Sequence, residues 1–262
     1  MITIKKPEHF ERMEVAGRCV AAVHRAVRRA AEPGITTREL DEIAARVIKD
    51  HDCRPSFLNY HGFPAHICAS QNEIIVHGIP GQYQLRDGDI LSIDAGAIYQ
   101  RYHADAAITF GIGEISDEAR DLIEVTEQAM WAGIEAVRPG ARVGDVGAAV
   151  QAVGESGGYG IVREYVGHGI GLNMHEKPNV PNYGAPGTGM RLRTGMAICI
   201  EPMFNLGDHE TLLEDDGWTV VTSDGSLSAH WEHTVALTES GVKVLTAQDE
   251  LKADLWEVAS GG

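Results

Sequence analysis

Five residues that could hold metal ions are spread over more than half of the chain, within a sequence that partly repeats. They are Asp94, Asp105, His168, Glu201 and Glu232. Residues 86–94 (R-D-G-D-I-L-S-I-D) resemble residues 193–201 (R-T-G-M-A-I-C-I-E), which follow 107 positions later. Residues 32–36 and 138–142 repeat in the same way at a distance of 106. We infer a duplicated unit with one acid at the same place in each copy, an arrangement that could clamp two metal ions between two halves.

Asp94 and Asp105 lie in apolar segments that predict buried strands. A buried carboxylate is costly unless it is protonated, paired or bound to a metal. A hairpin turn at Tyr99 and Gln100 would place the two acids directly opposite each other, with Cβ atoms roughly 5 Å apart. Two like charges at that distance favour a cation between them. The alternative is two ordinary acids, one capping a turn and the other in a salt bridge.

The other three candidates also adjoin apolar or glycine-rich segments. Glu201 ends the run A-I-C-I, Glu232 enters the strand-like H-T-V-A-L, and His168 lies between glycines in V-G-H-G-I-G. One imidazole with four carboxylates suits Mn, Fe, Co or Zn better than copper. Two such ions about 3.5–4 Å apart could activate a bridging water and polarise a carbonyl. The residues therefore predict metal-assisted hydrolysis.

Two further histidines are predicted to act in the same site. They are His77 in I-V-H-G-I-P and His175 in N-M-H-E-K-P, and H-G-I-P of the first half echoes G-H-G-I-G of the second. His103 and His230 could be either structural or functional. We interpret the remaining candidates as ordinary surface or core histidines, namely His24, His51 and His209.

Helix pairs followed by strands, twice over, must position these residues, which predicts an α+β architecture. Apolar periodicity and Pro-Gly stops predict helices at 7–31, 37–50, 117–137 and 143–153. Short apolar runs predict strands at 74–76, 90–93, 106–110, 197–200, 218–222 and 234–237. From residue 245 onward we expect a short helix and a loose tail.

Composition narrows the function. The 262 residues, 44% of them hydrophobic, predict one catalytic domain, 1–262, with halves at roughly 1–112 and 113–245 and a tail at 246–262. A net charge of −16 argues against binding to nucleic acid or to a membrane surface. The N-terminus has no signal-peptide core, and no apolar run approaches the ~18 residues of a membrane span. We therefore expect a cytoplasmic protein whose four cysteines, Cys19, Cys53, Cys68 and Cys199, are reduced.

Taken together, the motifs resemble the type I methionine aminopeptidases. The resemblance covers about residues 4–245. It rests on S-Q-N-E-I-I-V-H-G-I-P, S-I-D-A-G, H-A-D-A-A-I-T-F, V-G-H-G-I-G-L-N-M-H-E-K-P, I-E-P-M and D-G-W-T-V…S-A-H-W-E-H-T. It implies the pita-bread fold, in which two pseudo-symmetric α+β halves enclose a dinuclear metal site. It also implies removal of the initiator methionine from nascent proteins with a small second residue.

The resemblance assigns roles to residues. The five candidates would ligate two divalent ions (Co, Mn, Fe(II) or Zn), with Asp105 and Glu232 bridging them. Glu201 would also shuttle the proton of a metal-bridged hydroxide that attacks the scissile carbonyl. His77 would contact the substrate amine or scissile nitrogen, and His175 would stabilise the carbonyl oxygen as it becomes anionic.

The same resemblance implies a methionine pocket and a set of partners. Aromatic and sulfur-bearing walls suit a flexible thioether, although simple core packing would explain each residue equally well. The implied partners are nascent polypeptide N-termini at the ribosome, bound by a monomer. The pocket residues would be Phe57, Tyr60, Phe63, Cys68, Met174 and Trp218, together with His77 and His175.

Some positions depart from the commonest pattern, and other functions remain open. Met174 stands where Phe is frequent, and His230-Trp231 replaces a frequent Gln-Tyr or Gln-Phe. These changes leave the ligands intact but affect pocket shape. One alternative is an Xaa-Pro aminopeptidase or prolidase, which usually carries an extra N-terminal domain. Another is a non-catalytic binding module of the same fold, which typically lacks some ligands.

Overall fold

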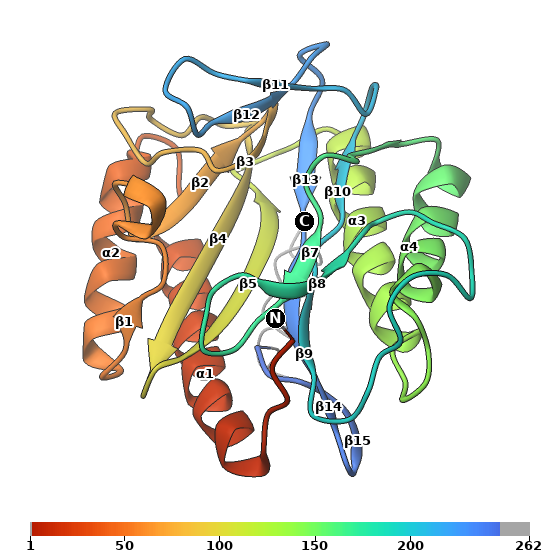
Figure 1. Cartoon of the computed structure of the whole chain (residues 1–262). Helices are drawn as coiled ribbons and strands as arrows, with labels where there is room; N and C mark the ends of the chain where they lie inside the picture. Colours follow the sequence, from red (N-terminus) through yellow and green to blue (C-terminus); the bar gives the residue numbers. More distant parts are fainter. Residues whose placement is uncertain (1, 247–262) are drawn as a thin grey trace.

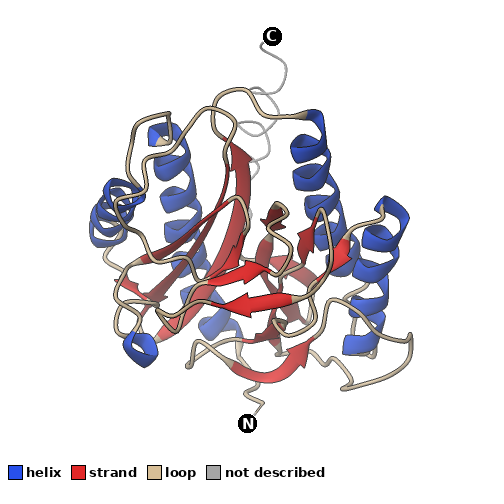
Figure 2. Ribbon diagram, turned by 90° about the horizontal axis from the view of Figure 1, so that it is seen from above, coloured by secondary structure: helices blue, strands red, loops and turns tan. Residues whose placement is uncertain are grey.

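Two helix pairs cover the outer side of one curved sheet in the computed structural model, which describes residues 2–246. Helices α1 (Pro7–Ala30) and α2 (Thr37–Asp50) accompany the first half, and α3 (Asp117–Glu135) and α4 (Val143–Gly157) the second (Figure 1). Figure 2 shows, from above, that the helices lie around the strands on the outside. Among residues 2–246, no helix combines the length and the apolar character needed to cross a membrane.

The main sheet joins the two halves along one pair of strands. Its order is β1-β4-β5-β14-β9-β7-β8, with β2 also paired to β4 and β15 to β14. The halves meet where β5 pairs with β14, and Glu232 there lies opposite Ala107. The strands are β1 (Arg54–Pro55), β2 (Ile67–Gln71), β4 (Ile90–Tyr99), β5 (Tyr102–Gly111), β7 (Gly167–Gly169), β8 (Glu176–Val180), β9 (Ala197–Ile200), β14 (Glu232–Thr238) and β15 (Gly241–Val244).

Two small sheets and a short 3-10 helix complete the described chain. One sheet has the order β13-β10-β6 and the other β11-β12-β3. The 3-10 helix is η1 (Tyr60–Gly62). The small-sheet strands are β3 (Ile74–Val76), β6 (Gly160–Ile161), β10 (Met203–Asn205), β11 (Thr211–Leu213), β12 (Val220–Thr222) and β13 (Ser228–His230). These segments matter for the site because β3 leads directly into His77 and β13 ends at His230.

The helices form where apolar periodicity and Pro-Gly stops predict them. In α1, Val20, Val23 and Val27 are at most 1% exposed and face the sheet. Helix α2 begins with a capping box, in which the Thr36 hydroxyl accepts from the Glu39 amide at 3.2 Å and the Glu39 carboxylate accepts from the Thr36 amide. The buried valines of α1 close the side of the sheet that faces this helix to water.

The duplicated unit has equivalent hydrogen bonds in both halves. The Gly34 amide donates to the Leu85 carbonyl at 2.7 Å, and the Gly140 amide donates to the Leu192 carbonyl at 3.0 Å. Both partners have moved by 106 or 107 positions, the distance of the sequence repeat. The isolated strand bridges repeat too, linking 36 with 84 and 142 with 191. The pseudo-symmetric α+β fold expected from the sequence is confirmed, while the division near residue 112 stays a prediction.

The predicted helices and strands are present, but several of them begin or end at other residues than predicted. All four predicted helices are present, and strands 74–76 and 197–200 have the predicted bounds. Strands β4 and β5 each run for ten residues, well beyond their apolar cores, because small residues continue the hairpin. Strand β12 begins only at Val220 and leaves Trp218 in a loop. The predicted tail helix lies almost entirely outside the described residues.

The predicted hairpin register is wrong by two residues. The turn is formed by Gln100 and Arg101, both with positive φ (45° and 77°), and Tyr99 pairs with Tyr102. Tyr102 belongs to the strand because it is buried and stacks on a histidine ring of α1 at 4.8 Å. Asp94 therefore lies opposite Ala107 instead of Asp105. A shift of two leaves both acids on the same face, since side chains alternate with a period of two.

One close contact predicts an unusual response to mutation. Gly17 lies within α1, where alanine normally favours the helix by about 1 kcal/mol. A methyl group at Gly17 would overlap the carbonyl oxygen of Leu245. We expect Gly17→Ala to lower the unfolding free energy by about 1 to 3 kcal/mol in urea denaturation. Gly81→Ala is the control, because its nearest neighbour would be 3.8 Å away, and equal stabilities of the two variants would contradict the contact.

Candidate metal centre and substrate pocket

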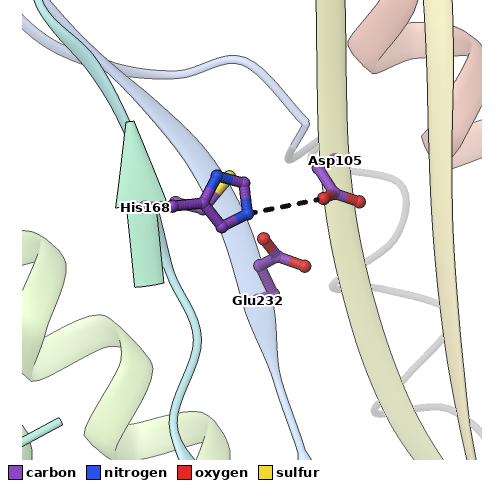
Figure 3. A group of neighbouring side chains, drawn as sticks. Asp105, His168 and Glu232 are labelled. Atoms are coloured by element: carbon purple, nitrogen blue, oxygen red, sulfur yellow. Dashed lines mark ion pairs between the residues drawn. The ribbon is translucent and has the colours of Figure 1, made fainter. Parts of the chain in front are cut away.

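The five candidate ligands come from both halves and converge beside the β5–β14 junction. Asp94 and Asp105 come from β4 and β5 of the first half. From the second half, His168 lies in β7, Glu201 directly follows β9, and Glu232 begins β14. Figure 3 shows the side chains of Asp105, His168 and Glu232 directed toward one another. His168 Nε2 lies 3.8 Å from Asp105 Oδ2 and 3.5 Å from Glu201 Oε1.

The buried carboxylates strongly perturb one another. Burial raises the pKa of Asp94 to about 7, although a hydrogen bond with Asp105 opposes the rise. Burial, followed by the charges of Glu232 and Asp94, raises the pKa of Asp105 well above its usual value. Glu201 and Glu232 have raised pKa values for the same reasons, burial first and neighbouring carboxylates next. Without a cation, such a cluster holds protons at neutral pH.

The tautomer of His168 suits a metal ligand. Its Nδ1 lies 3.0 Å from the Gly169 carbonyl oxygen, which can only accept a hydrogen bond. Nδ1 therefore carries the proton, and Nε2 presents its lone pair to the acids. Burial, together with the charge of His175, lowers the pKa of His168 to about 3, so the ring is neutral. A backbone partner that fixes the second nitrogen is the usual support of a ligating histidine.

Unpaired oxygens show that the cluster fits a divalent cation. Among the described residues, the buried side-chain atoms without a hydrogen-bond partner include one oxygen of each of four acids, Asp94, Asp105, Glu201 and Glu232. Such atoms are rare in folded proteins, because leaving them unpaired is costly. Four inward carboxylates and one neutral imidazole match the donors preferred by Mn, Fe, Co and Zn. The residues present therefore fit divalent metal binding.

Sequence reasoning missed one member of this cluster. The sulfur of Cys199 lies within 4.8 Å of the nearest donor atoms of Asp105, His168 and Glu232. Cys199 precedes Glu201 by two residues on β9, and strand alternation could have placed both on the same face. Its thiol is fully buried, hydrogen-bonds to Glu232 and has a pKa raised first by burial and then by the surrounding carboxylates.

The same cavity contains every site residue expected from the sequence. A pocket of about 460 Å³ is lined by all five candidate metal ligands, by His77 and His175, and by all six other residues of the expected methionine pocket. Its apolar wall is built from aromatic rings. Phe63 packs edge-on against Trp218 at 5.2 Å and against Phe57 at 6.5 Å. Cys68 and Met174 are buried in the same group.

The two catalytic histidine candidates lie on different sides of the cavity. His175 Nδ1 lies 2.8 Å from the Tyr60 hydroxyl, and its ring centre is 4.2 Å from that of His168. His77 has a positive φ of 60° and faces the rings of Tyr165 and Trp218. Burial, followed by the charge of His175, lowers the pKa of His77 to about 4. The His77 imidazole is therefore neutral at physiological pH.

The remaining wall of the pocket was not expected. His230 is 2% exposed, and its Nε2 lies 4.0 Å from Glu201 Oε2. His103, by contrast, does not line this pocket and instead contacts the Ser56 hydroxyl at 2.9 Å. A hydrophobicity pattern cannot reveal which residues from distant segments close a cavity. The unexpected lining residues are His61, Val76, Tyr165, Val166 and His230.

The raised carboxylate pKa values predict how pH and metal affect stability. Acids with raised pKa values stabilise the fold below their unfolded pKa of about 4, and this contribution is lost as the pH rises through the folded values. The chelator-treated protein should therefore lose thermal stability between pH 5 and pH 8, passing through the value of about 7 at Asp94. Saturating Mn²⁺ should raise the unfolding temperature more at pH 8 than at pH 5.5, where protons compete for the ligands.

Differential scanning fluorimetry across this pH range measures both effects. Asp94→Asn should flatten the pH dependence, because it removes one member of the cluster. Asp215→Asn serves as the control, since Asp215 is exposed and lies outside the pocket. A chelator-treated protein whose stability does not change with pH, and which Mn²⁺ does not stabilise, would contradict the interpretation of the cluster.

Comparison with known proteins gives the chain its family. The model of metallopeptidase family M24 matches residues 11–239. "Methionine aminopeptidase 1" of Bacillus subtilis is 48% identical over 246 residues, which cover 94% of this chain and 99% of that protein. "Methionine aminopeptidase" of Clostridium acetobutylicum is 49% identical over 247 residues, with the same coverage.

Solved structures of similar proteins indicate the same family. The structure of methionine aminopeptidase from Thermotoga maritima has a TM-score of 0.93 and 42% identity, and the match covers 95% of this chain and all of that one. Prolidase from Pyrococcus furiosus shares the fold at a TM-score of 0.77 and 24% identity, but this chain covers only 66% of it. The chain therefore belongs to metallopeptidase family M24 and, within it, to the methionine aminopeptidases.

Proposed function

We propose that the protein hydrolyses the peptide bond after an N-terminal methionine, using two divalent metal ions and favouring substrates with a small second residue. The observation that carries this proposal is one cavity that joins an apolar, sulfur-containing wall to a buried cluster of acids and histidines. A methionine side chain requires the first feature and hydrolysis of its peptide bond the second. The family and its methionine aminopeptidase relatives support the same reaction.

The residues that would hold the divalent ions are Asp94, Asp105, His168, Glu201 and Glu232, and Asp105 and Glu232 would serve both ions. Divalent cations bound there supply Lewis acidity, which activates a water molecule and polarises the scissile carbonyl. The raised pKa values of the acids support this assignment, because neighbouring carboxylates of this kind ionise fully only when a cation compensates them.

The apolar wall selects the substrate side chain. Phe57, Phe63 and Cys68 are at most 7% exposed, so a methionine side chain that enters exchanges water for aromatic and sulfur contacts. Met174 at this wall can adapt its own flexible thioether to the ligand, where an aromatic ring could not. The second substrate residue follows the scissile bond and so lies beside the metal ligands, where a small side chain should be preferred.

Three side chains handle protons and charge during the reaction. Glu201 takes a proton from the attacking water and passes it to the leaving amine. His77, on the Trp218 side, contacts the scissile nitrogen. His175 donates from Nε2 to the carbonyl oxygen as that oxygen becomes negative.

Tyr60 gives His175 the tautomer that this role requires. When the Tyr60 hydroxyl donates to Nδ1 at 2.8 Å, the neutral ring keeps its proton on Nε2. Burial, together with the charge of His61, lowers the pKa of His175 and supports the neutral form. Tyr60 thus serves both as a wall of the methionine pocket and as the partner of His175.

The substrates we propose are the N-termini of nascent polypeptides presented at the ribosome. We assign the activity to the monomer, because one chain supplies every candidate residue of the site. We place it in the cytoplasm together with these proposed substrates.

A peptide panel tests the reaction directly. Protein loaded with Mn²⁺, Fe²⁺ or Co²⁺ should cleave Met-Ala-Ser but not Met-Lys-Ser, because a long second residue does not fit beside the metal ligands. Product methionine and metal content are measured in the same sample. Preferential cleavage of Ala-Pro would support a prolidase instead, and inactivity with every metal under anaerobic conditions would refute hydrolysis.

Substitution of Tyr60 tests the proposed tautomer. Tyr60→Phe should lower kcat about 10-fold to 100-fold, because it releases the imidazole from its productive orientation. His175→Ala should lower kcat about 100-fold to 1,000-fold, the usual effect of losing one oxyanion donor. Metal content should stay unchanged in both.

Tyr159→Phe is the matched control, since the Tyr159 hydroxyl contacts Asp121 outside the pocket. Loss of metal from the His175 variant would show instead that His175 is a ligand. A Tyr60 variant with full kcat would exclude the tautomer role.

A further inference from the structure

A buried ion pair joins the N-terminal segment to the loop that carries His175. Lys5 Nζ lies 2.9 Å from Glu176 Oε2, and the two side chains are 3% and 1% exposed. The Thr3 hydroxyl donates to the same carboxylate oxygen. Figure 1 shows the N-terminus next to β7, β8 and β9. Fully buried ion pairs are uncommon, because desolvation of both charges is costly and must be offset by their mutual contacts.

The carboxylate of Glu176 closes the loop on itself. Its other oxygen, Oε1, accepts a hydrogen bond from the Asn173 amide at 3.3 Å. Residues 173 and 176 are thereby tied together, and Met174 and His175 project from between them into the substrate pocket. At the start of the loop, the Gly171 carbonyl accepts from the His103 amide at 2.8 Å, which attaches it to β5.

The N-terminal segment is itself fixed to the sheet. The Lys5 amide donates to the Gly195 carbonyl at 2.6 Å, and the Gly195 amide donates to the Leu237 carbonyl of β14 at 2.7 Å. Lys5 also packs against Gly171 so closely that a Cβ atom there would overlap its side chain. The contact chain therefore runs from β14, through Gly195 and Lys5, to the loop.

The charge states are consistent with a true ion pair. Burial alone would raise the pKa of Glu176, but the hydrogen bonds from Thr3 and Lys5 outweigh it and lower the pKa below its usual value. Burial lowers the pKa of Lys5, while Glu176 opposes that change. Each group therefore stabilises the charged form of the other.

We propose that Lys5 and Glu176 are positioning residues for catalysis. The ion pair holds loop 171–176 against the sheet and so fixes His175 where its imidazole meets the substrate carbonyl. The N-terminal segment is thus a working part of the active site, although none of its residues lines the pocket. This inference rests on the proposed function, in which His175 stabilises the developing oxyanion.

A pair of double variants tests the proposal. Single substitutions would leave one buried charge unpaired and could prevent folding. Lys5→Met/Glu176→Met removes both charges with side chains of similar length and also removes the acceptor for the Asn173 amide. Lys5→Met/Glu176→Gln removes both charges but keeps that acceptor. Glu14→Met/Lys243→Met is the control, because this ion pair is partly exposed and lies outside the loop.

Three measurements are made on each variant: the unfolding temperature, hydrogen exchange of the peptide that covers 171–176, and kcat and KM for Met-Ala-Ser with Mn²⁺. The Met/Met variant should fold, exchange faster in the loop, and lose about 10-fold to 100-fold in kcat, with KM changing less than about threefold. The Met/Gln variant should recover part of the kcat and part of the protection. The control pair should match the wild type in loop exchange and kcat.

Two results would overturn the proposal. One is a folded Met/Met variant with wild-type exchange in the loop and wild-type kcat. The other is faster loop exchange with unchanged kcat, because the anchor would then hold the loop without serving the chemistry. A wild-type protein that cleaves no methionine peptide would instead refute the proposed function, while hydrogen exchange would still show whether Lys5 and Glu176 anchor the loop.

Discussion

Four acids buried around one point form the constraint on which the rest of the structure depends. Each raises the pKa of at least one other, so the fold must hold like charges together against their repulsion. Antiparallel pairing across β4, β5, β14 and β9 does this with backbone hydrogen bonds, which do not depend on charge. Helices on the outer side bury the back of these strands. Backbone pairing at the centre of the sheet thus offsets the electrostatic cost of holding these acids together.

Much of this arrangement could be read from the chain. The acids were recognisable because each interrupts or borders an apolar run, and a buried strand leaves few other uses for a carboxylate. Helix positions followed from apolar residues at helical spacing and from Pro-Gly stops. These signals are local, and a single sequence preserves them well. The resemblance to a known family added the roles of His77 and His175, which local patterns alone could not separate.

Other features could not be predicted, for physical reasons. The β4–β5 turn uses Gln100 and Arg101 at positive φ. Neither residue type predicts that conformation, whereas Gly or Asn would. Strand alternation could place Cys199 on the same face as Glu201, but only the folded sheet shows that this face also meets Asp105 and Glu232. The pairing of Lys5 with Glu176 spans 171 positions and is fixed only by the folded path of the chain. Contacts of this kind depend on tertiary geometry and produce no periodic pattern in the sequence.

The equivalent hydrogen bonds at Gly34 and Gly140 have a consequence for the origin of the molecule. An ancestral chain of half this length, paired with a second copy of itself, would have brought two acid-bearing strands from each subunit to a shared axis. Fusion of the two genes would then have released each copy from symmetry. One copy could specialise in the aromatic wall around Phe57 and Phe63, and the other in the histidine loops at His168 and His175. The matching positions at the axis would have kept a carboxylate in both copies, as Asp94 and Glu201 do.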